Sequence, residues 1–85
     1  MNDYADINEY DVLLEIFRFI RNYSTTTYTL PQVFKELIRY MKDGGYQVKV
    51  IDDQHRDHKI LQVEEHRYKI IRYPEWVTYD VQRTA

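Results

Sequence analysis

The chain has 85 residues, of which 44% are hydrophobic, 15% aromatic and 31% charged, with a formal net charge of −2. This length allows one domain, and the absence of cysteine excludes disulfide bonds and thiolate metal sites. The near-neutral charge excludes the basic coat of a protein that wraps nucleic acid. No apolar run reaches the ~18 residues of a transmembrane helix, and the opening Met1-Asn2-Asp3-Tyr4 lacks the basic start of a signal peptide. We therefore expect a cytoplasmic globular domain.

The charge is unevenly distributed along the chain. Residues 1–17 contain five acidic residues and no lysine or arginine, a charge of −5, whereas the remainder contains 12 basic and 9 acidic residues, a charge of +3. Acidic side chains near the start of a helix are stabilised by the helix dipole, which explains part of this asymmetry. The acidic residues are Asp3, Asp6, Glu9, Asp11 and Glu15.

The first helix is predicted over residues 6–23. Asp6 can cap its start, and Glu9 follows three residues later, which is the spacing of a capping box. Its polar residues form one narrow stripe, so that most of the circumference is apolar. Such a helix is normally buried on more than one side. We therefore expect it either to run through the centre of the domain or to face another chain as well. The stripe consists of Asp11, Glu15, Arg18 and Asn22.

The second helix is predicted over residues 30–43, after an extended connector rich in serine and threonine. Thr29 and Gln32 form a capping box, and Pro31 sits in the first turn, where its missing N–H costs nothing. Two glycines then end the helix at residues 44–45. Its apolar residues recur at helical spacing: Leu30, Val33, Phe34, Leu37, Ile38 and Met41.

After the second helix the apolar period changes from that of a helix to two, which indicates strands. We predict three of them, over residues 46–50, 60–64 and 67–73, and residues 76–81 are a candidate for a fourth, short strand. A polar loop over Asp52–Lys59 and a turn at Glu65–His66 separate them, and residues 82–85 are expected to fray. On the last strand, Val77, Tyr79 and Val81 share the inward face. The fold class is α+β, with two N-terminal helices packed on one face of a three- to four-stranded antiparallel meander.

The polar loop contains the one cluster of candidate metal ligands or acid–base groups. Its residues lack the helical spacing that fixes a zinc site, and no glycine shapes them into a calcium loop. Glycine-rich phosphate-binding motifs and nucleophile motifs are also absent from the sequence. We therefore expect no metal, no cofactor and no catalytic residue. The cluster consists of Asp52, Asp53, His55, Asp57 and His58, with His66 following.

Nucleic-acid binding is the alternative function. Helix 30–43 would act as a recognition helix, with Lys35 and Arg39 on its outward face, and the following hairpin would act as a wing. Such a winged-helix-like regulator needs a helix directly before the recognition helix, whereas here the preceding segment is the Ser/Thr connector. The loop that would form the wing tip also contains three aspartates, which repel phosphate.

A protein–protein interface is the favoured interpretation, because tyrosine, tryptophan and arginine supply most binding energy in such contacts. We predict Tyr73 and Trp76 as aromatic anchors, with Arg72 and Arg56 as charged partners. The acidic face of the first helix is a second candidate surface, which would dock on a basic groove of a target. The surplus of apolar side chains would also suit a homodimer. The acidic candidates are Asp3, Glu9, Asp11 and Glu15.

In its short length, its dense tyrosine and acidic content and its lack of cysteine and of catalytic motifs, the chain resembles the small accessory proteins of bacteriophages and mobile elements. Many of these proteins bind one host or defence protein. The resemblance implies a non-enzymatic regulatory module that inhibits such a protein by binding it. The acidic face of the first helix would direct this module to a nucleic-acid-binding surface.

Overall fold

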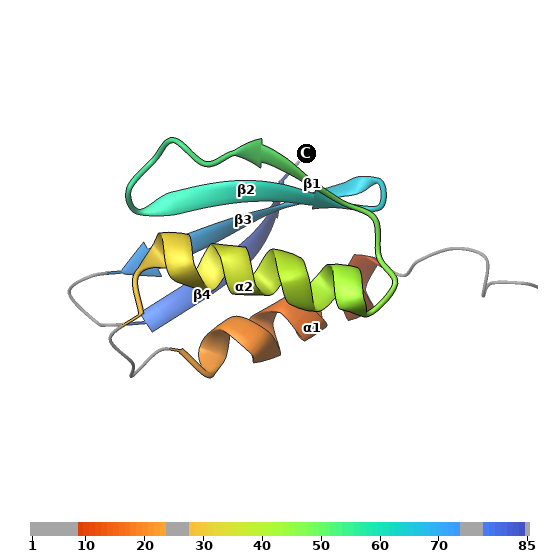
Figure 1. The fold of residues 1–85 in the computed structure, drawn as a ribbon, viewed down its shortest axis with the longest axis horizontal. Coiled ribbons are helices and arrows are strands. Elements are labelled where there is room, and N and C mark those ends of the chain that lie inside the picture. Colours follow the sequence, from red (N-terminus) through yellow and green to blue (C-terminus); the bar gives the residue numbers. More distant parts are fainter. Residues whose placement is uncertain (1–8, 24–27, 74–77, 85) are drawn as a thin grey trace, which may run out of the picture.

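The computed structural model describes residues 9–23, 28–73 and 78–84. It confirms the α+β class, with two N-terminal helices on one face of an antiparallel meander (Figure 1). The four strands follow one another in the sheet in the order β1-β2-β3-β4, and each neighbouring pair is antiparallel. Over these ranges, neither helix has the length and apolar content needed to cross a bilayer. The elements are α1 (Glu9–Arg21), α2 (Leu30–Asp43), β1 (Val48–Asp52), β2 (His58–Val63), β3 (His66–Tyr73) and β4 (Thr78–Thr84).

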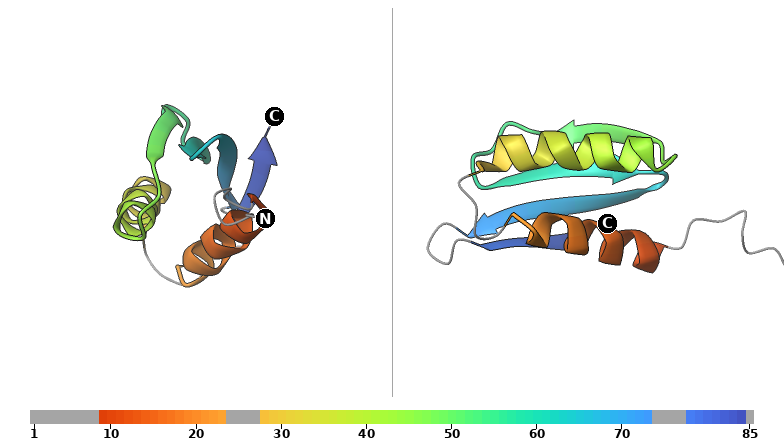
Figure 2. Two further views of the ribbon diagram at one scale, coloured as in Figure 1. Left: turned by 90° about the vertical axis from the view of Figure 1, so that its right-hand side faces the viewer. Right: turned by 60° about the horizontal axis from the view of Figure 1, so that its bottom comes forward.

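The two helices cover different parts of the same face of the sheet. Helix α1 packs against β4, whereas α2 packs against β1 and β2. The sheet curves around them, so that α2 lies beside the green strand β1 and α1 beside the blue strand β4 (Figure 2). On the opposite face of the sheet, no described element covers the side chains, and Ile71 is half-buried there.

Alternate residues of the strands supply the sheet side of the core. Tyr68 and Ile70 on β3 have no exposed surface, and Tyr79 and Val81 on β4 are 5% and 8% exposed. The predicted inward face of the last strand is therefore confirmed for Tyr79 and Val81, and Val77 lies outside the described residues. The other buried core residues are Val12, Ile16 and Ile20 of α1, Leu30, Val33, Phe34, Leu37 and Met41 of α2, and Leu61 and Val63 of β2.

Helix α2 begins and ends at the predicted residues, and its capping box is formed on both sides. The Thr29 N–H donates to Gln32 Oε1 at 2.8 Å, and the Gln32 N–H donates to Thr29 Oγ1 at 3.5 Å. Past its end, Gly45 has a φ of 95°, a conformation that favours glycine. Helix α1 ends at Arg21, two residues earlier than predicted, and its expected cap Asp6 lies outside the described residues.

The polar loop is shorter than predicted because residues at both of its ends belong to strands. Asp52 pairs with Ile60 as the last residue of β1, and His58 pairs with Ile71 as the first residue of β2. The loop therefore spans residues 53–57 rather than 52–59. Backbone pairing, to which polar residues contribute as well as apolar ones, sets these strand ends.

The turn between β2 and β3 was predicted one residue too late. Val63 pairs with His66, so the two-residue turn is Glu64–Glu65 and His66 belongs to β3. Glu64 has a φ of 57°, the positive value that tight hairpins require. Strand β4 also extends further than predicted. Its residues 82–84, expected to fray, pair with β3.

Replacing Thr29 by alanine should lower the free energy of unfolding by about 1 kcal/mol, because the Gln32 N–H loses its acceptor at the start of α2. Urea unfolding of the two proteins measures this change. Thr29→Ser keeps the hydroxyl and should stay close to the parent chain. Equal losses in both variants would contradict the assigned cap.

Candidate protein-binding surface

Four aromatic rings form a continuous chain along the line where α1 meets α2. The ring of Tyr40 stacks on Phe19 with centroids 4.5 Å apart. Phe19 contacts Tyr23 at 5.4 Å, and Tyr23 contacts Tyr28 at 5.1 Å, both with tilted rings. We call these four residues, Phe19, Tyr23, Tyr28 and Tyr40, the aromatic seam.

The local sequence explains how the rings come together. Phe19 and Tyr23 are four residues apart, so they lie on one side of α1 and its end. Tyr40 follows the buried Leu37 by three residues on α2, which places it beside the core face of that helix. Because the two helices pack on different strands, the broad rings fill the space between them.

The two ends of the seam are open to solvent. Tyr28 is 44% exposed and Tyr40 is 43% exposed, whereas Phe19 and Tyr23 are half-buried. A tyrosine ring held in place by its neighbours loses little conformational entropy when a partner covers it. The ends of the seam therefore have the properties of binding anchors.

Glu15 links the two helices next to the seam. Its two carboxylate oxygens accept hydrogen bonds from the hydroxyls of Tyr40, at 3.3 Å, and Tyr46, at 3.1 Å. Burial raises the pKa of Tyr46 above its ordinary value of 10.0, and the hydrogen bond to Glu15 and the charges of Glu15 and Asp11 raise it further. The phenol of Tyr46 therefore stays a neutral donor at physiological pH.

Carboxylates act on the tyrosines of the seam and on Tyr46 beside it. Burial and then the charge of Glu36 raise the pKa of Tyr23, just as Glu15 and Asp11 act on Tyr46. Arg21, in contrast, lies over the ring of Phe17 at 5.7 Å, and Phe17 lines a hollow with Val81 of β4. The side of α1 that meets α2 is thus acidic and aromatic.

The acidic residues predicted to bind a partner fall into two groups. Asp11 is exposed and Glu15 is half-buried, and both influence the phenol of Tyr46 beside the seam. Asp3 lies outside the described residues, and so does the side chain of Glu9, although its backbone begins α1.

The three described members of the predicted interface at the end of β3 line two different cavities. Tyr73 is 37% exposed and lines a hollow with Phe17 and Tyr79. Arg56 and Arg72 line a different cavity, near the start of α2. Trp76, the other expected anchor, lies outside the described residues.

The histidines of the polar loop pack on each other. The rings of His55 and His58 stack with centroids 4.1 Å apart, and His55 Nε2 lies 3.5 Å from an oxygen of Asp52. Burial, with the neighbouring His55 and Lys69, lowers the pKa of His58. Within the described ranges, no three histidine, aspartate or glutamate side chains are grouped so as to hold a metal ion.

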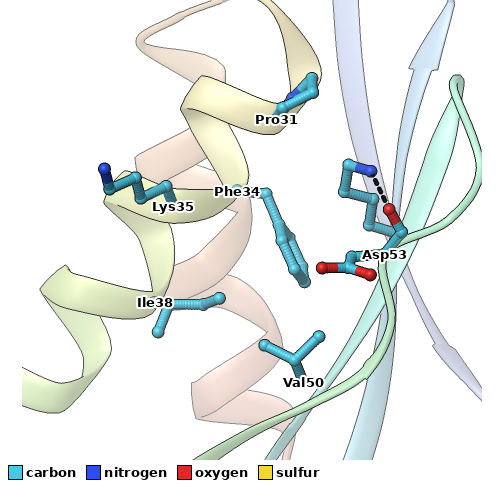
Figure 3. A pocket seen from close by; sticks show the side chains of 7 residues that line it. Pro31, Phe34, Lys35, Ile38, Val50 and Asp53 are labelled. Carbon is cyan, nitrogen blue, oxygen red and sulfur yellow. Dashed lines mark hydrogen bonds between the residues drawn. The ribbon is translucent and has the colours of Figure 1, made fainter.

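A cavity of about 430 Å³ lies between α2 and Val50, on the helix-facing side of β1. Figure 3 shows Phe34, Ile38 and Val50 around this space, with the amino group of Lys35 directed away from it. Lys59, predicted within the polar loop, belongs to β2 and is 6% exposed at this cavity. Its inward position follows from its pairing with Ile70, which the sequence alone does not display.

Comparisons of the chain with protein-family models, with curated proteins and with solved structures found no match.

Replacing Glu15 by glutamine should lower the pKa of Tyr46 toward 10.0, because the phenolate loses a neighbouring negative charge. A pH titration followed by the NMR signals of the Tyr46 ring measures the shift. Asp57→Asn, in the loop at residues 53–57, serves as the control and should leave Tyr46 unchanged.

The same pKa shift carries a prediction for stability. The folded-state pKa of Tyr46 lies above the unfolded value, so its contribution is complete below pH 10.0 and is lost as the pH rises through the folded pKa. Glu15→Gln should therefore lose less stability than the parent chain over this alkaline range. An identical pH dependence of urea unfolding in the two proteins would contradict the proposed coupling.

Proposed function

We propose that the chain is a non-enzymatic binding module of the cytoplasm, which binds another protein through the aromatic seam. The partner surface would be basic, of the kind that otherwise binds DNA or RNA, so that the module acts as an inhibitor by occupying it. The observation that carries this proposal is the exposure of Tyr28 and Tyr40 at the two ends of a stacked chain of rings. Glu15 accepts a hydrogen bond from Tyr40, the charge of Glu36 acts on Tyr23, and Asp11 acts on the neighbouring Tyr46.

The chemistry of the seam suits a partner rich in lysine and arginine. The faces of tyrosine rings attract cations, and neighbouring carboxylates add charge attraction and steer the encounter. Because stacking already holds the rings, binding orders few side chains.

The competition with nucleic acid follows from the charge of the surface. Carboxylates beside planar rings present negative charge and flat faces, as a nucleic acid does. The compositional resemblance to accessory proteins of bacteriophages and mobile elements supports a host or defence protein as the target. If this is so, the partner should lose its DNA or RNA binding when the complex forms.

Tyr40→Ala and Tyr28→Ala should each weaken binding by about 30-fold, the effect of losing an interface anchor worth about 2 kcal/mol. The partner is captured from native host cells, purified, and titrated with each variant in a calorimeter. Tyr40→Phe keeps the ring stack and should bind nearly as well as the parent chain.

Tyr73→Ala is the matched control, since Tyr73 is comparably exposed at 37% but lines the hollow with Phe17 and has no ring contact with the four seam residues among those described. Full affinity of both seam variants, with loss in Tyr73→Ala, would move the interface to the end of β3. Urea unfolding of each variant shows whether the fold is intact, and light scattering of the free chain tests for a homodimer.

DNA binding through α2 is the second candidate, because Lys35, Arg39 and Lys42 are all exposed and spaced along one side of that helix. If three phosphate contacts form, the logarithm of the affinity should fall against the logarithm of salt concentration with a slope of about −2.7. A gel shift at several salt concentrations measures this slope. No shift by the parent chain, or an unchanged shift in Arg39→Ala, would remove this candidate.

A further inference from the structure

A second cavity, of about 490 Å³, opens at the start of α2 beside the loop at residues 53–57. Three cationic side chains line it: Arg56 from the loop, Lys59 from β2 and Arg72 from β3. They do not belong to the aromatic seam, and the function proposed above does not use them.

The sheet register brings these cations together. Lys59 pairs with Ile70, so Arg72, two residues further along β3, lies on the same inward face. The backbone N–H of Arg72 donates to the backbone carbonyl of Asp57 at 2.8 Å. This hydrogen bond holds the loop against β3 and places Arg56 at the same cavity.

Among the described residues, ion pairs do not neutralise the positive charge of this cluster. In residues 9–23, 28–73 and 78–84, no carboxylate forms an ion pair with Arg56, Lys59 or Arg72. Lys59 is only 6% exposed, and its Nζ donates to the carbonyls of Asp53 at 2.6 Å and His55 at 3.0 Å. Carbonyl dipoles satisfy hydrogen bonds but leave the full charge, which is costly to bury without a counter-charge.

The charge of the cavity can be counted from its lining. The three cations and the carboxylate of Asp57 give 3 − 1 = +2, with His55 neutral. A phosphate monoester carries about −1.5 to −2 at neutral pH, whereas a carboxylate carries only one negative charge. A guanidinium group of arginine can also donate two parallel hydrogen bonds to two oxygens of one phosphate. The helix end itself adds little, because Thr29 already caps the Gln32 N–H and Pro31 has no N–H.

We propose that this cavity binds the phosphate group of a small phosphate monoester, with Arg56 and Arg72 at its oxygens and Lys59 supplying charge from the buried side. The neighbouring apolar cavity shares Pro31 and Lys59 with it. An organic group attached to the phosphate could therefore extend toward Phe34 and Val50.

The test is an NMR titration of the whole chain, labelled with nitrogen-15, at constant ionic strength. The ligands are inorganic phosphate, adenosine 5′-monophosphate and adenosine. Saturable shifts of the amides of residues 56–59 and Arg72 are expected with both phosphates and not with adenosine. Tighter binding of the monophosphate supports an ester as the ligand, whereas equal binding supports the free anion.

Arg56→Gln and Arg72→Gln should each weaken phosphate binding about tenfold, the effect of one lost charge-assisted hydrogen bond. Arg56 is exposed, so its replacement leaves the core untouched. Arg39→Gln removes a cation from the outside of α2 and is the control. No saturable shift, an equal loss in Arg39→Gln, or binding of adenosine as tight as that of its monophosphate would overturn the proposal.

Discussion

The structure depends on the way in which one curved face of a four-stranded sheet is shared between two helices. Helix α1 packs on β4 and α2 packs on β1 and β2, so the helices meet over the middle of the sheet rather than along one strand. Core residues such as Ile16 of α1 and Leu37 of α2 are fully buried on the sides of the helices that face the sheet. Between the helices remains a line that side chains must fill, and in this chain tyrosine and phenylalanine fill it.

Tyrosine suits that line because its ring packs against apolar neighbours while its hydroxyl reaches a polar partner. Tyr46 and Tyr40 donate to the two oxygens of Glu15, which joins α1 to the end of α2 and to the segment before β1. Tyr79 donates to the carbonyl of Tyr28 at 2.8 Å. Burial raises the pKa of Tyr79, and the charge and hydrogen bond of Arg72 oppose that increase. The phenol of Tyr79 thus lies between the aromatic seam and the cationic cavity.

The sequence predicted the features that local patterns determine. Helix α2 was predicted to the residue, because a capping box, a proline and two glycines mark its ends. The antiparallel order of the strands was predicted and their number was left at three or four, whereas the strand ends depend on partners along the ladder. Asp52 and His58 extend two strands because each pairs with an apolar residue on the neighbouring strand. Glu64 forms the turn with a positive φ, which a glutamate in the sequence does not predict.

The candidate sites depend on contacts between elements, which one sequence does not display. The four-residue spacing of Phe19 and Tyr23 places them on one side of α1. It does not predict that the ring of Tyr40, on α2, stacks on Phe19. Arg56 and Arg72 were predicted as binding residues from composition and strand position. Their common cavity depends on the register of β2 and β3 and on the buried Lys59.

We propose that the aromatic seam binds a partner in addition to packing the two helices together. Cross-saturation NMR of the labelled chain in complex with its captured partner tests it most directly, because the method identifies the residues that the partner covers. We expect strong saturation transfer at Tyr28 and Tyr40, with little at Ile71 on the opposite face of the sheet. Transfer confined to that opposite face, with both tyrosines unaffected, would contradict it.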